Sequence, residues 1–339
     1  MELSFLYPSE PLISRVVIGH NLDFRKLLPE GKRIAVITHE NTRSLPVGEH
    51  FTFPRGEEYK TRAIKEHLED ELLKAGFGRD AVIVGFGGGI VTDVAGFVAA
   101  TFCRGVPYFA IPTTLLGMVD AAIGGKTAVN TPFAKNAIGA FHPPAGIFID
   151  TSFLQTLSEK QLQEGLAEII KHALIASEEL FAFLGGNYPL WKARDVSFIE
   201  TLIYRSCAIK ADVVKRDPRE KGMRRILNFG HTVGHALEVA TSHRITHGEA
   251  VAVGMMAECR LSQFLPWADL KKIEELYSLY GLPVDAQFNR QNFYEALKFD
   301  KKNRDGAVRM ATLDRIGLAS NHEGEYCTPL DFAKLEKIL

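Results

Sequence analysis

The first 150 residues contain a series of short apolar, β-branched runs, separated by glycine-rich turns and amphipathic segments. Four of these runs have the length of a buried strand, at residues 33–38, 81–85, 108–111 and 147–150. Segments 61–75 and 90–102 have helical periodicity and lie between strands. Strands that alternate with helices are typical of a parallel sheet flanked by helices. We therefore predict an α/β domain over residues 1–150.

After residue 150 the pattern changes, because apolar residues recur with a period of about 3.6 and β-branched runs become rare. Ser158 with Gln161 three residues later predicts a helix start, and Thr246 with Glu249 repeats this capping-box pattern. Helices are predicted over residues 158–176, 196–214, 230–242, 246–264 and 270–280. Residues 151–339 are thus predicted to form a second, mostly α-helical domain.

The composition limits the partners of this chain. Of 339 residues, 46% are hydrophobic and 24% charged, and the formal net charge of −1 gives no field that favours nucleic acid or an anionic membrane. The most apolar stretch, 106–125, is interrupted by Pro107, Pro112 and Asp120, which argues against a membrane span. The N-terminus lacks the pattern of a signal peptide, and the four cysteines lack metal or redox spacing. We expect buried thiols and a cytoplasmic location.

Three histidines form the sharpest local signal. His231 and His235 are four residues apart, so a helix places them on one face, and His247 follows in the first turn of the next predicted helix. Ring nitrogens of histidine are common zinc ligands. Clustering by chance of surface or core histidines explains the same pattern equally well, since such pairs also occur without metal.

A carboxylate in the helix over 158–176 could complete such a site. Glu168 and Lys171 lie three residues apart, away from the apolar stripe of that helix. One carboxylate and imidazole ligands would leave a coordination position open for substrate. Considered without the histidines, Glu168 and Lys171 are better explained as a solvated ion pair.

A glycine-rich turn joins the strand over 81–85 to the helix over 90–102. Gly87, Gly88 and Gly89 would let backbone N–H groups approach a pyrophosphate, and the helix N-terminus would favour its charge. The spacing does not match the GxGxxG fingerprint of dinucleotide-binding folds. A tight structural turn is an equally good interpretation.

Two further polar stretches are candidates for anion binding. Residues 112–139 are predicted to be rich in loops and contain Thr113, Thr114, Asp120, Lys126, Lys135 and Asn136, which could bind a polyhydroxylated anion or form an ordinary polar loop. Aspartate at position 120 breaks the phosphate-loop spacing that Gly125, Lys126 and Thr127 partly fit, which excludes that motif. The second stretch contains Lys210, Arg216, Glu220, Arg224 and Asn228 and is either a solvated face or part of the same cavity.

Taken together, these segments resemble the 3-dehydroquinate synthase family over residues 54–317. The resemblance rests on eight motifs in the family's order: GGGxxxDxxGFxA from Gly87, RGVP from Arg104, PTTLL from Pro112, VDxxxGGKTxVN from Val119, KNxIGxF from Lys135, GxAEIIK from Gly165, LNFGHTxGHAxE from Leu227 and HGEAVAxGM from His247. It implies an N-terminal Rossmann-like parallel-sheet domain that binds NAD and a mostly α-helical metal-binding domain.

The resemblance also implies roles for individual residues. The metal ligands would be Glu168, His231 and His247 for zinc, with cobalt as an alternative. His235 would transfer protons, Glu220 would be a second acid–base residue, and Lys171 and Lys126 would also be catalytic. NAD would contact Glu57, Lys60, Gly88, Gly89, Asp93, Thr113, Thr114 and Lys135. Substrate would contact Arg104, Asp120, Lys126, Asn136, Lys171, Lys210, Arg224, Asn228 and Lys302 or its neighbour Lys301. Arg104 would act across the interface of a homodimer.

The implied reaction converts 3-deoxy-D-arabino-heptulosonate 7-phosphate into 3-dehydroquinate and phosphate, a step of the shikimate pathway of aromatic amino acid biosynthesis. It proceeds by transient oxidation by NAD, elimination of phosphate, re-reduction, ring opening and aldol closure. The chain departs from the family pattern at Ala121 and Ala122, where relatives often have serines, and at 39–41, where the partner of the NAD ribose stays open.

Three other functions are alternatives to this one. A related sugar-phosphate cyclase would use a substrate without a carboxylate, which makes Arg224 and Asn228 the residues to compare. A metal-dependent alcohol or glycerol dehydrogenase would produce NADH and commonly has aspartate where Glu168 stands. A catalytically inactive binding protein is the least favoured, because every candidate ligand and acid–base residue is intact.

Overall fold

The computed structural model describes residues 13–40, 42, 45–242, 244–298 and 307–338. The chain forms two compact units. The first consists of Met1–Val17, Asp23–Pro112 and Gly125–Ile149, and the second of Ile18–Leu22, Thr113–Gly124 and Asp150–Leu339. Two short segments of the N-terminal half therefore belong to the second unit.

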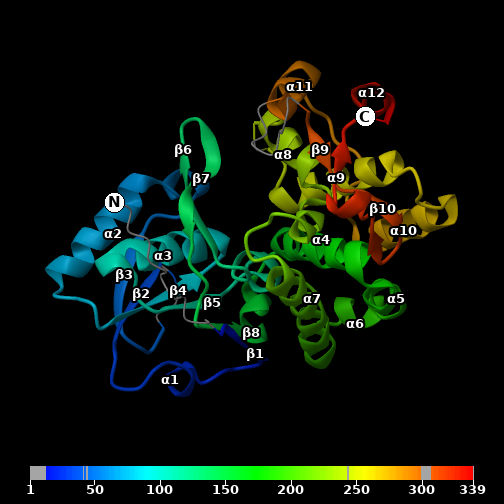
Figure 1. The fold of residues 1–339 in the computed structure, drawn as a ribbon. Helices are drawn as coiled ribbons and strands as arrows, with labels where there is room; N and C mark the ends of the chain where they lie inside the picture. Colours follow the sequence, from blue (N-terminus) through cyan, green and yellow to red (C-terminus); the bar gives the residue numbers. More distant parts are fainter. Residues whose placement is uncertain (1–12, 41, 43–44, 243, 299–306, 339) are drawn as a thin grey trace, which may run out of the picture. The chain divides into compact units, whose positions relative to one another are not determined.

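The first unit is built on a six-stranded sheet with the strand order β1-β8-β5-β4-β2-β3 (Figure 1). Its strands are β1 (Arg15–Gly19), β2 (Arg33–His39), β3 (Glu49–Phe53), β4 (Ala81–Gly87), β5 (Tyr108–Pro112) and β8 (Gly146–Asp150). The pairs from β8 through β5, β4 and β2 to β3 are all parallel. The predicted parallel α/β fold is thus confirmed, and the four predicted runs are β2, β4, β5 and β8.

The two strands that the sequence did not indicate lie at the edges of the sheet. β3 alternates exposed and buried residues, and β1 has no fully buried residue. Edge strands need no continuous apolar run because only part of their surface packs against the core.

The loop-rich expectation for residues 112–139 was wrong for its second half. β6 (Lys126–Thr131) and β7 (Ala134–Phe141) form a separate antiparallel hairpin in which Val129 pairs with Ile138. Most residues of β7 are exposed, so polar and small side chains conceal the strand pattern. The hairpin places Lys126, Lys135 and Asn136 on strands rather than on a loop, although the register shifts between Val129 and Thr131 and Asn136 has a φ of 51°.

The helices of the first unit are α1 (Phe24–Leu27), α2 (Arg62–Lys74) and α3 (Gly89–Thr101). The hydroxyl of Thr61 caps α2 by accepting the N–H of Ile64. α3 follows β4 directly and packs against β4 and β5. Its N-cap is Gly88, which has no side chain to satisfy the first N–H groups of the helix.

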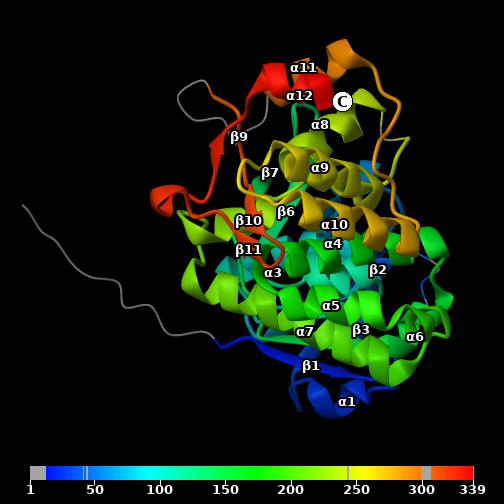
Figure 2. The same ribbon diagram turned by 90° about the vertical axis from the view of Figure 1, so that its right-hand side faces the viewer.

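The second unit is mostly helical, as predicted. Its helices are α4 (Glu159–Ala176), α5 (Glu178–Gly186), α6 (Tyr188–Lys192), α7 (Val196–Arg216), α8 (His231–Ala240), α9 (His247–Leu261), α10 (Trp267–Tyr280), α11 (Arg290–Lys298) and α12 (Phe332–Ile338), shown in Figure 2. The short strands are β9 (Arg309–Met310), β10 (Leu313–Arg315), β11 (Leu318–Ala319) and β12 (Thr328–Pro329). Both predicted capping boxes, at Ser158 and Thr246, are confirmed.

Close helix packing brings the histidine-bearing segments together. α8 packs against α9, and an added Cβ at Gly234 would lie only 3.0 Å from the carbonyl oxygen of Ala250. At the start of α9, a Cβ on Gly248 would overlap the Cα of Glu164 in α4. Residues without a Cβ therefore let the first turn of α9, with His247, approach both α8 and α4.

The described residues contain no helix that is long and apolar enough to cross a membrane. All four cysteines are free, with Cys207 and Cys259 buried and Cys103 and Cys327 half-buried. Burial raises the pKa of Cys207 to about 12, so that thiol stays protonated near neutral pH.

Candidate functional site

Glu168 from α4, His231 from α8 and His247 from α9 converge in the second unit. Nε2 of His231 lies 3.4 Å and Nε2 of His247 lies 3.5 Å from the same carboxylate oxygen, Oε1 of Glu168. One potential ligand atom from each residue lies within 4.8 Å of the others, close enough to hold one metal ion. A carboxylate with two imidazoles is a ligand set that suits zinc.

The protonation states of Glu168 and His231 favour binding of a divalent cation. Glu168 is fully buried, and neither of its oxygens has a hydrogen-bond partner of good geometry, although Lys171 forms an ion pair with Oε2. Burial opposes ionisation of Glu168, but the charge of Lys171 and the contact with His231 hold its pKa well below the usual range. Burial lowers the pKa of His231, which favours the neutral ring that a metal requires.

The pKa of His247 shifts in the opposite direction to that of His231. Burial acts to lower its pKa, but contacts with the carboxylates of Glu168 and Glu238 raise the pKa to about 10. The carboxylates that favour a proton at this position also favour a metal cation in its place. The donor set therefore fits a divalent metal.

His235 lies beside this group. Its ring centroid is 5.3 Å from that of His231 and 6.2 Å from that of His247. Two more groups among the described residues have metal-ligand geometry: His235 with Glu238 and His247, and Asp120 with Glu168 and His172. By geometry alone, His247 could therefore bind a metal either with Glu168 and His231 or with His235 and Glu238.

A charged network surrounds Glu168. Nζ of Lys210 lies 2.6 Å from Oδ1 of Asp120, and Nζ of Lys171 lies 3.8 Å from the same atom. Burial, the largest effect, would raise the pKa of Asp120, yet the charges of Lys210 and Lys171 together with His172 outweigh it and the pKa is lowered. Burial lowers the pKa of Lys210, whereas Glu168 and Asp120 overcome burial at Lys171 and raise its pKa. The sequence pattern did not show this burial.

Arg224 and Asn228 are held by the segment before α8. The Arg224 guanidinium group is buried and donates to the carbonyl oxygens of Pro218 and Gly124. Asn228 donates from Nδ2 to Oε1 of Glu220 at 2.6 Å, and Glu220 has a φ of 57°. Asn228 thereby holds the carboxylate of a predicted acid–base residue in one orientation.

Several residues predicted to contact NAD or substrate lie together in the first unit. Nζ of Lys60, which is buried, lies 2.5 Å from both Oδ2 of Asp93 and Oδ1 of Asn136. Asn130 joins this group, because it donates to Oε1 of Glu57 at 2.6 Å and accepts the backbone N–H of Asn136 at 3.0 Å. Asn130 had been assigned no role, although it ends the VDxxxGGKTxVN motif.

The start of α3 fits a pyrophosphate. Gly88 and Gly89 stand where β4 ends and α3 begins, at the carboxyl edge of a parallel sheet, and no side chain caps the first N–H groups. That combination is typical of dinucleotide-binding helix N-termini.

Other predicted residues are more dispersed. Thr113 and Thr114 belong to the second unit, whereas Lys126 and Lys135 lie on the β6–β7 hairpin. Arg104 is exposed and has a φ of 74°. Asn41, Lys301 and Lys302 lie outside the described residues.

Three buried side chains next to the metal-ligand group have no role predicted from the sequence. Glu238 and His172 contribute to the alternative ligand sets, and Glu258 of α9 accepts the backbone N–H of Gly230 at 2.7 Å. Glu258 therefore caps the helix that begins with His231, a function that an N-cap glycine cannot perform. Glu238 ends the LNFGHTxGHAxE motif, which is the signal that could have identified it.

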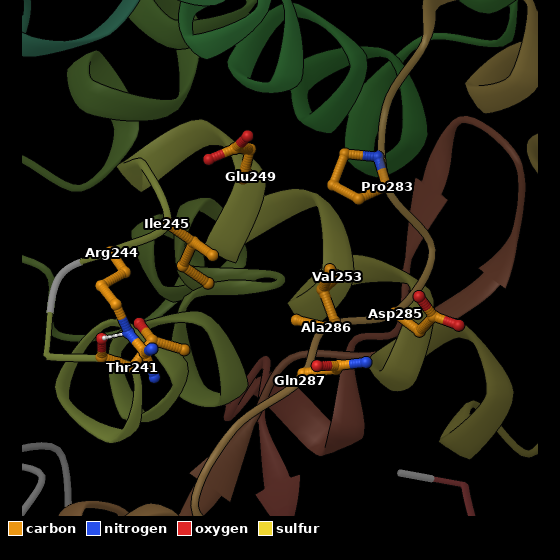
Figure 3. A pocket seen from close by; sticks show the side chains of 9 residues that line it. All are labelled: Thr241, Arg244, Ile245, Glu249, Val253, Pro283, Asp285, Ala286 and Gln287. Atoms are coloured by element: carbon orange, nitrogen blue, oxygen red, sulfur yellow. Dashed lines mark hydrogen bonds between the residues drawn. The ribbon is translucent and has the colours of Figure 1, made fainter.

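A separate pocket of about 330 Å³ lies where α8 ends and α9 begins (Figure 3). Its polar lining comes from Thr241, Arg244, Glu249, Asp285 and Gln287, and Arg244 donates to the carbonyl oxygen of Thr241. None of the predicted site residues lines it.

Comparison with known proteins identifies relatives of this chain. Residues 50–164 match the family model described as "3-dehydroquinate synthase N-terminal", and residues 165–303 match "3-dehydroquinate synthase C-terminal". A 3-dehydroquinate synthase from Geobacter sp. (strain M21) is 44% identical over 282 residues, which cover 78% of this chain and 78% of the relative.

Two solved structures share the fold over nearly the whole chain. The 2-epi-5-epi-valiolone synthase ValA from Streptomyces hygroscopicus subsp. jinggangensis 5008, with NAD+ and Zn2+ bound, has a TM-score of 0.87 and 29% identity, with coverage of 98% of this chain and 97% of that one. A 2-deoxy-scyllo-inosose synthase complexed with carbaglucose-6-phosphate, NAD+ and Co2+ has a TM-score of 0.83 and 25% identity, with 95% of each chain covered.

Proposed function

The chain belongs to the 3-dehydroquinate synthase family, and from this premise we propose that it converts 3-deoxy-D-arabino-heptulosonate 7-phosphate into 3-dehydroquinate and phosphate in the shikimate pathway. The observation that carries the proposal is the convergence of Glu168, His231 and His247 beside the buried ammonium groups of Lys171 and Lys210. A metal ligand set beside fixed positive charge suits a phosphorylated substrate with neighbouring hydroxyl groups.

We propose that Glu168, His231 and His247 bind Zn²⁺, with Co²⁺ as a functional substitute, and that NAD is the second cofactor. Two structural relatives carry NAD+ with Zn2+ or Co2+, which supports both cofactors. A bound divalent cation supplies Lewis-acid polarisation of substrate oxygens, and NAD supplies a reversible hydride acceptor. The NAD-binding residues we assign are Glu57, Lys60, Gly88, Gly89, Asp93, Thr113, Thr114 and Lys135.

His235 is the proposed proton-transfer residue. It is half-buried and adjacent to His231 and His247, yet it lies outside the ligand group that contains Glu168. Glu220, held by Asn228, is the second acid–base group. Lys171 favours ionised oxygen atoms close to it through its buried positive charge.

Substrate recognition would depend on charge. The substrate has a carboxylate and a phosphate, and guanidinium and ammonium groups bind both through charge-assisted hydrogen bonds. The substrate-binding residues we assign are Arg104, Asp120, Lys126, Asn136, Lys171, Lys210, Arg224, Asn228 and Lys302.

The decisive assay measures phosphate release and NADH absorbance together, with the heptulosonate phosphate, catalytic NAD and zinc. Phosphate release without accumulation of NADH is the expected result, because the hydride returns to the product. Steady accumulation of NADH would identify a dehydrogenase instead.

A related cyclase activity is the second candidate, supported by the similarity to 2-epi-5-epi-valiolone synthase. It is tested in the same assay with sedoheptulose 7-phosphate and glucose 6-phosphate. If phosphate is released only from one of these sugars, the substrate assignment is wrong and the family assignment stands.

We further propose that the enzyme is a cytoplasmic homodimer in which Arg104 acts in the partner's site. The four free thiols support a reducing compartment. The exposure of Arg104 and its positive φ are consistent with a side chain that the backbone directs outward for a partner.

A further inference from the structure

The two ring nitrogens of His247 face two different buried carboxylates. Nε2 lies 3.5 Å from Oε1 of Glu168, and Nδ1 lies 3.6 Å from Oε1 of Glu238. Glu238 is only 7% exposed and comes from α8, whereas His247 begins α9. The position of this ring is therefore defined by contacts on both of its polar edges.

His231 shows the same arrangement. Its Nδ1 faces the carbonyl oxygen of Phe229 at 3.2 Å, while its Nε2 faces Oε1 of Glu168. In both rings, Nδ1 has an acceptor from the surrounding protein and Nε2 is directed at Glu168. A neutral imidazole with a proton on Nδ1 has its lone pair on Nε2, so both lone pairs converge on one place.

Glu238 could also be a ligand itself, because it forms a second potential metal group with His235 and His247. The contacts of His247 instead favour a role for Glu238 in orienting the His247 ring. Its Nε2 is directed at Glu168, which leaves Nδ1 as the nitrogen that Glu238 contacts. Metal-bound histidines usually donate their second N–H to a carboxylate or a carbonyl group, which fixes the tautomer and orientation of the ring.

We propose that Glu238 is the positioning residue of the metal site. By accepting a hydrogen bond from Nδ1 of His247, it keeps the Nε2 lone pair directed at an ion held with Glu168 and His231. This inference rests on the metal site of the proposed function and deepens it. The Glu238 carboxylate would orient the His247 ring without itself contacting the metal or the substrate.

The test measures zinc affinity of the full-length protein after removal of metal, by competition with a chromophoric chelator of known affinity. Glu238→Ala is expected to weaken zinc binding by about 10- to 100-fold, the range found for residues that orient metal ligands. Glu238→Gln should weaken it less, because the amide oxygen still accepts from Nδ1. Equal affinities of Glu238→Ala and the wild type would overturn the proposal.

Glu164→Gln is the matched control. It also removes one negative charge that acts on His247, but the ring nitrogens face Glu168 and Glu238 instead. We expect its zinc affinity to change by less than about fivefold, the effect of about 1 kcal/mol of charge interaction. A loss as large as that of Glu238→Ala would mean that net charge, and not ring orientation, sets the affinity.

The visible spectrum of the cobalt-loaded protein separates a positioning residue from a ligand. At saturating cobalt, Glu238→Gln should retain the band positions and intensities of the wild type, because its three ligands are the same. A change to a different coordination number would show that Glu238 binds the metal and would refute the positioning role. Failure of the wild type to bind zinc or cobalt would instead reject the proposed function. If Glu238→Ala does not fold, the isosteric Glu238→Gln variant still decides the question.

Discussion

Glu168 and Lys171 lie three residues apart on α4 and form an ion pair in the interior of the second unit. In the structure their side chains are 0% and 1% exposed. Burying both charges is unfavourable unless partners compensate, and Asp120, His231 and His247 provide such partners from distant parts of the chain.

At His235 we predict a separation of metal binding from activity. The variant His235→Ala should retain about one zinc ion per site, because the ligand group of Glu168, His231 and His247 is intact, while phosphate release falls by about 100-fold or more for loss of an acid–base group. Metal analysis and steady-state kinetics of the same preparation provide the check.

His231→Ala is the control for this prediction, and it should lose both zinc and activity. Substoichiometric zinc in His235→Ala would favour the alternative group of His235, Glu238 and His247.

His172 should make the protein sensitive to acid. Burial, followed by the charge of Lys171, lowers its pKa to about 3 from an unfolded value of about 6.5. The unfolded chain therefore binds a proton at a higher pH than the folded one, so folding stability contributed by the neutral ring is lost as pH falls below about 6.5. Urea unfolding between about pH 6 and pH 4 should give a free energy that falls by about 1.4 kcal/mol per pH unit from this residue.

The comparison variant is His172→Gln, which cannot titrate. It will be less stable at neutral pH because the contact of Nδ1 with Ser206 changes, but its pH slope should be shallower by the stated amount. Parallel slopes in the two proteins would rule out a neutral buried His172.

The role of a residue was predictable from the sequence where the residue belongs to a motif. It was not predictable where the role depends on contacts with another element. The three ligands come together as the resemblance implied, although whether they bind metal stays a prediction. Glu238 and Asn130 have clear contacts, yet each depends on a partner from another element. Sequence spacing does not encode such pairings, because helix packing and strand register create them.

At the scale of elements, the sequence indicated helices best where an end is capped. Ser158 and Thr246 marked the starts of α4 and α9, because a hydroxyl and a carboxylate or amide must occupy fixed positions to satisfy the first N–H groups. The β6–β7 hairpin was missed because polar and small side chains interrupt its apolar pattern and most of β7 is exposed. α5 was missed because it follows α4 without a loop, with Ser177 ending one helix and capping the next.

The packing of α9 on α4 gives a prediction for a helix contact. In Gly248→Ala the new methyl group would overlap the backbone of Glu164, which cannot rotate away as a side chain can. We expect a loss of about 1–3 kcal/mol in the free energy of unfolding, together with weaker zinc binding as His247 moves away from Glu168. Denaturant unfolding and chelator competition measure the two effects.

Gly186→Ala is the matched control, since it ends α5 and an added Cβ there meets no atom within 4 Å. Its stability should stay within about 1 kcal/mol of the wild type. If Gly248→Ala is equally tolerated, α9 does not depend on that close approach.

At the scale of the whole molecule, the dimer proposal predicts complementation between inactive subunits. Arg104→Ala and His235→Ala should each have little activity alone. A heterodimer of the two, isolated with two different affinity tags, contains one site with His235 from one subunit and Arg104 from the other. It should recover about half the activity of the wild-type dimer if the interface is isologous.

An inactive heterodimer would mean that Arg104 acts within its own subunit. Full activity of Arg104→Ala by itself would mean that Arg104 has no role. A monomeric wild type by light scattering would contradict the assembly itself.

The interleaving of the two units affects the order in which a newly made chain can fold. The segment Thr113–Gly124 leaves the ribosome well before α4 and α7, yet it supplies Asp120, the carboxylate that pairs with Lys210 and Lys171. Until those helices are synthesised, Asp120 lacks both of these lysines. In a fragment that begins at residue 150, Lys171 and Lys210 would be present without the carboxylate of Asp120 that pairs with them. The helical unit therefore cannot be excised as one continuous piece, and recombination at residue 150 would separate Asp120 from both lysines.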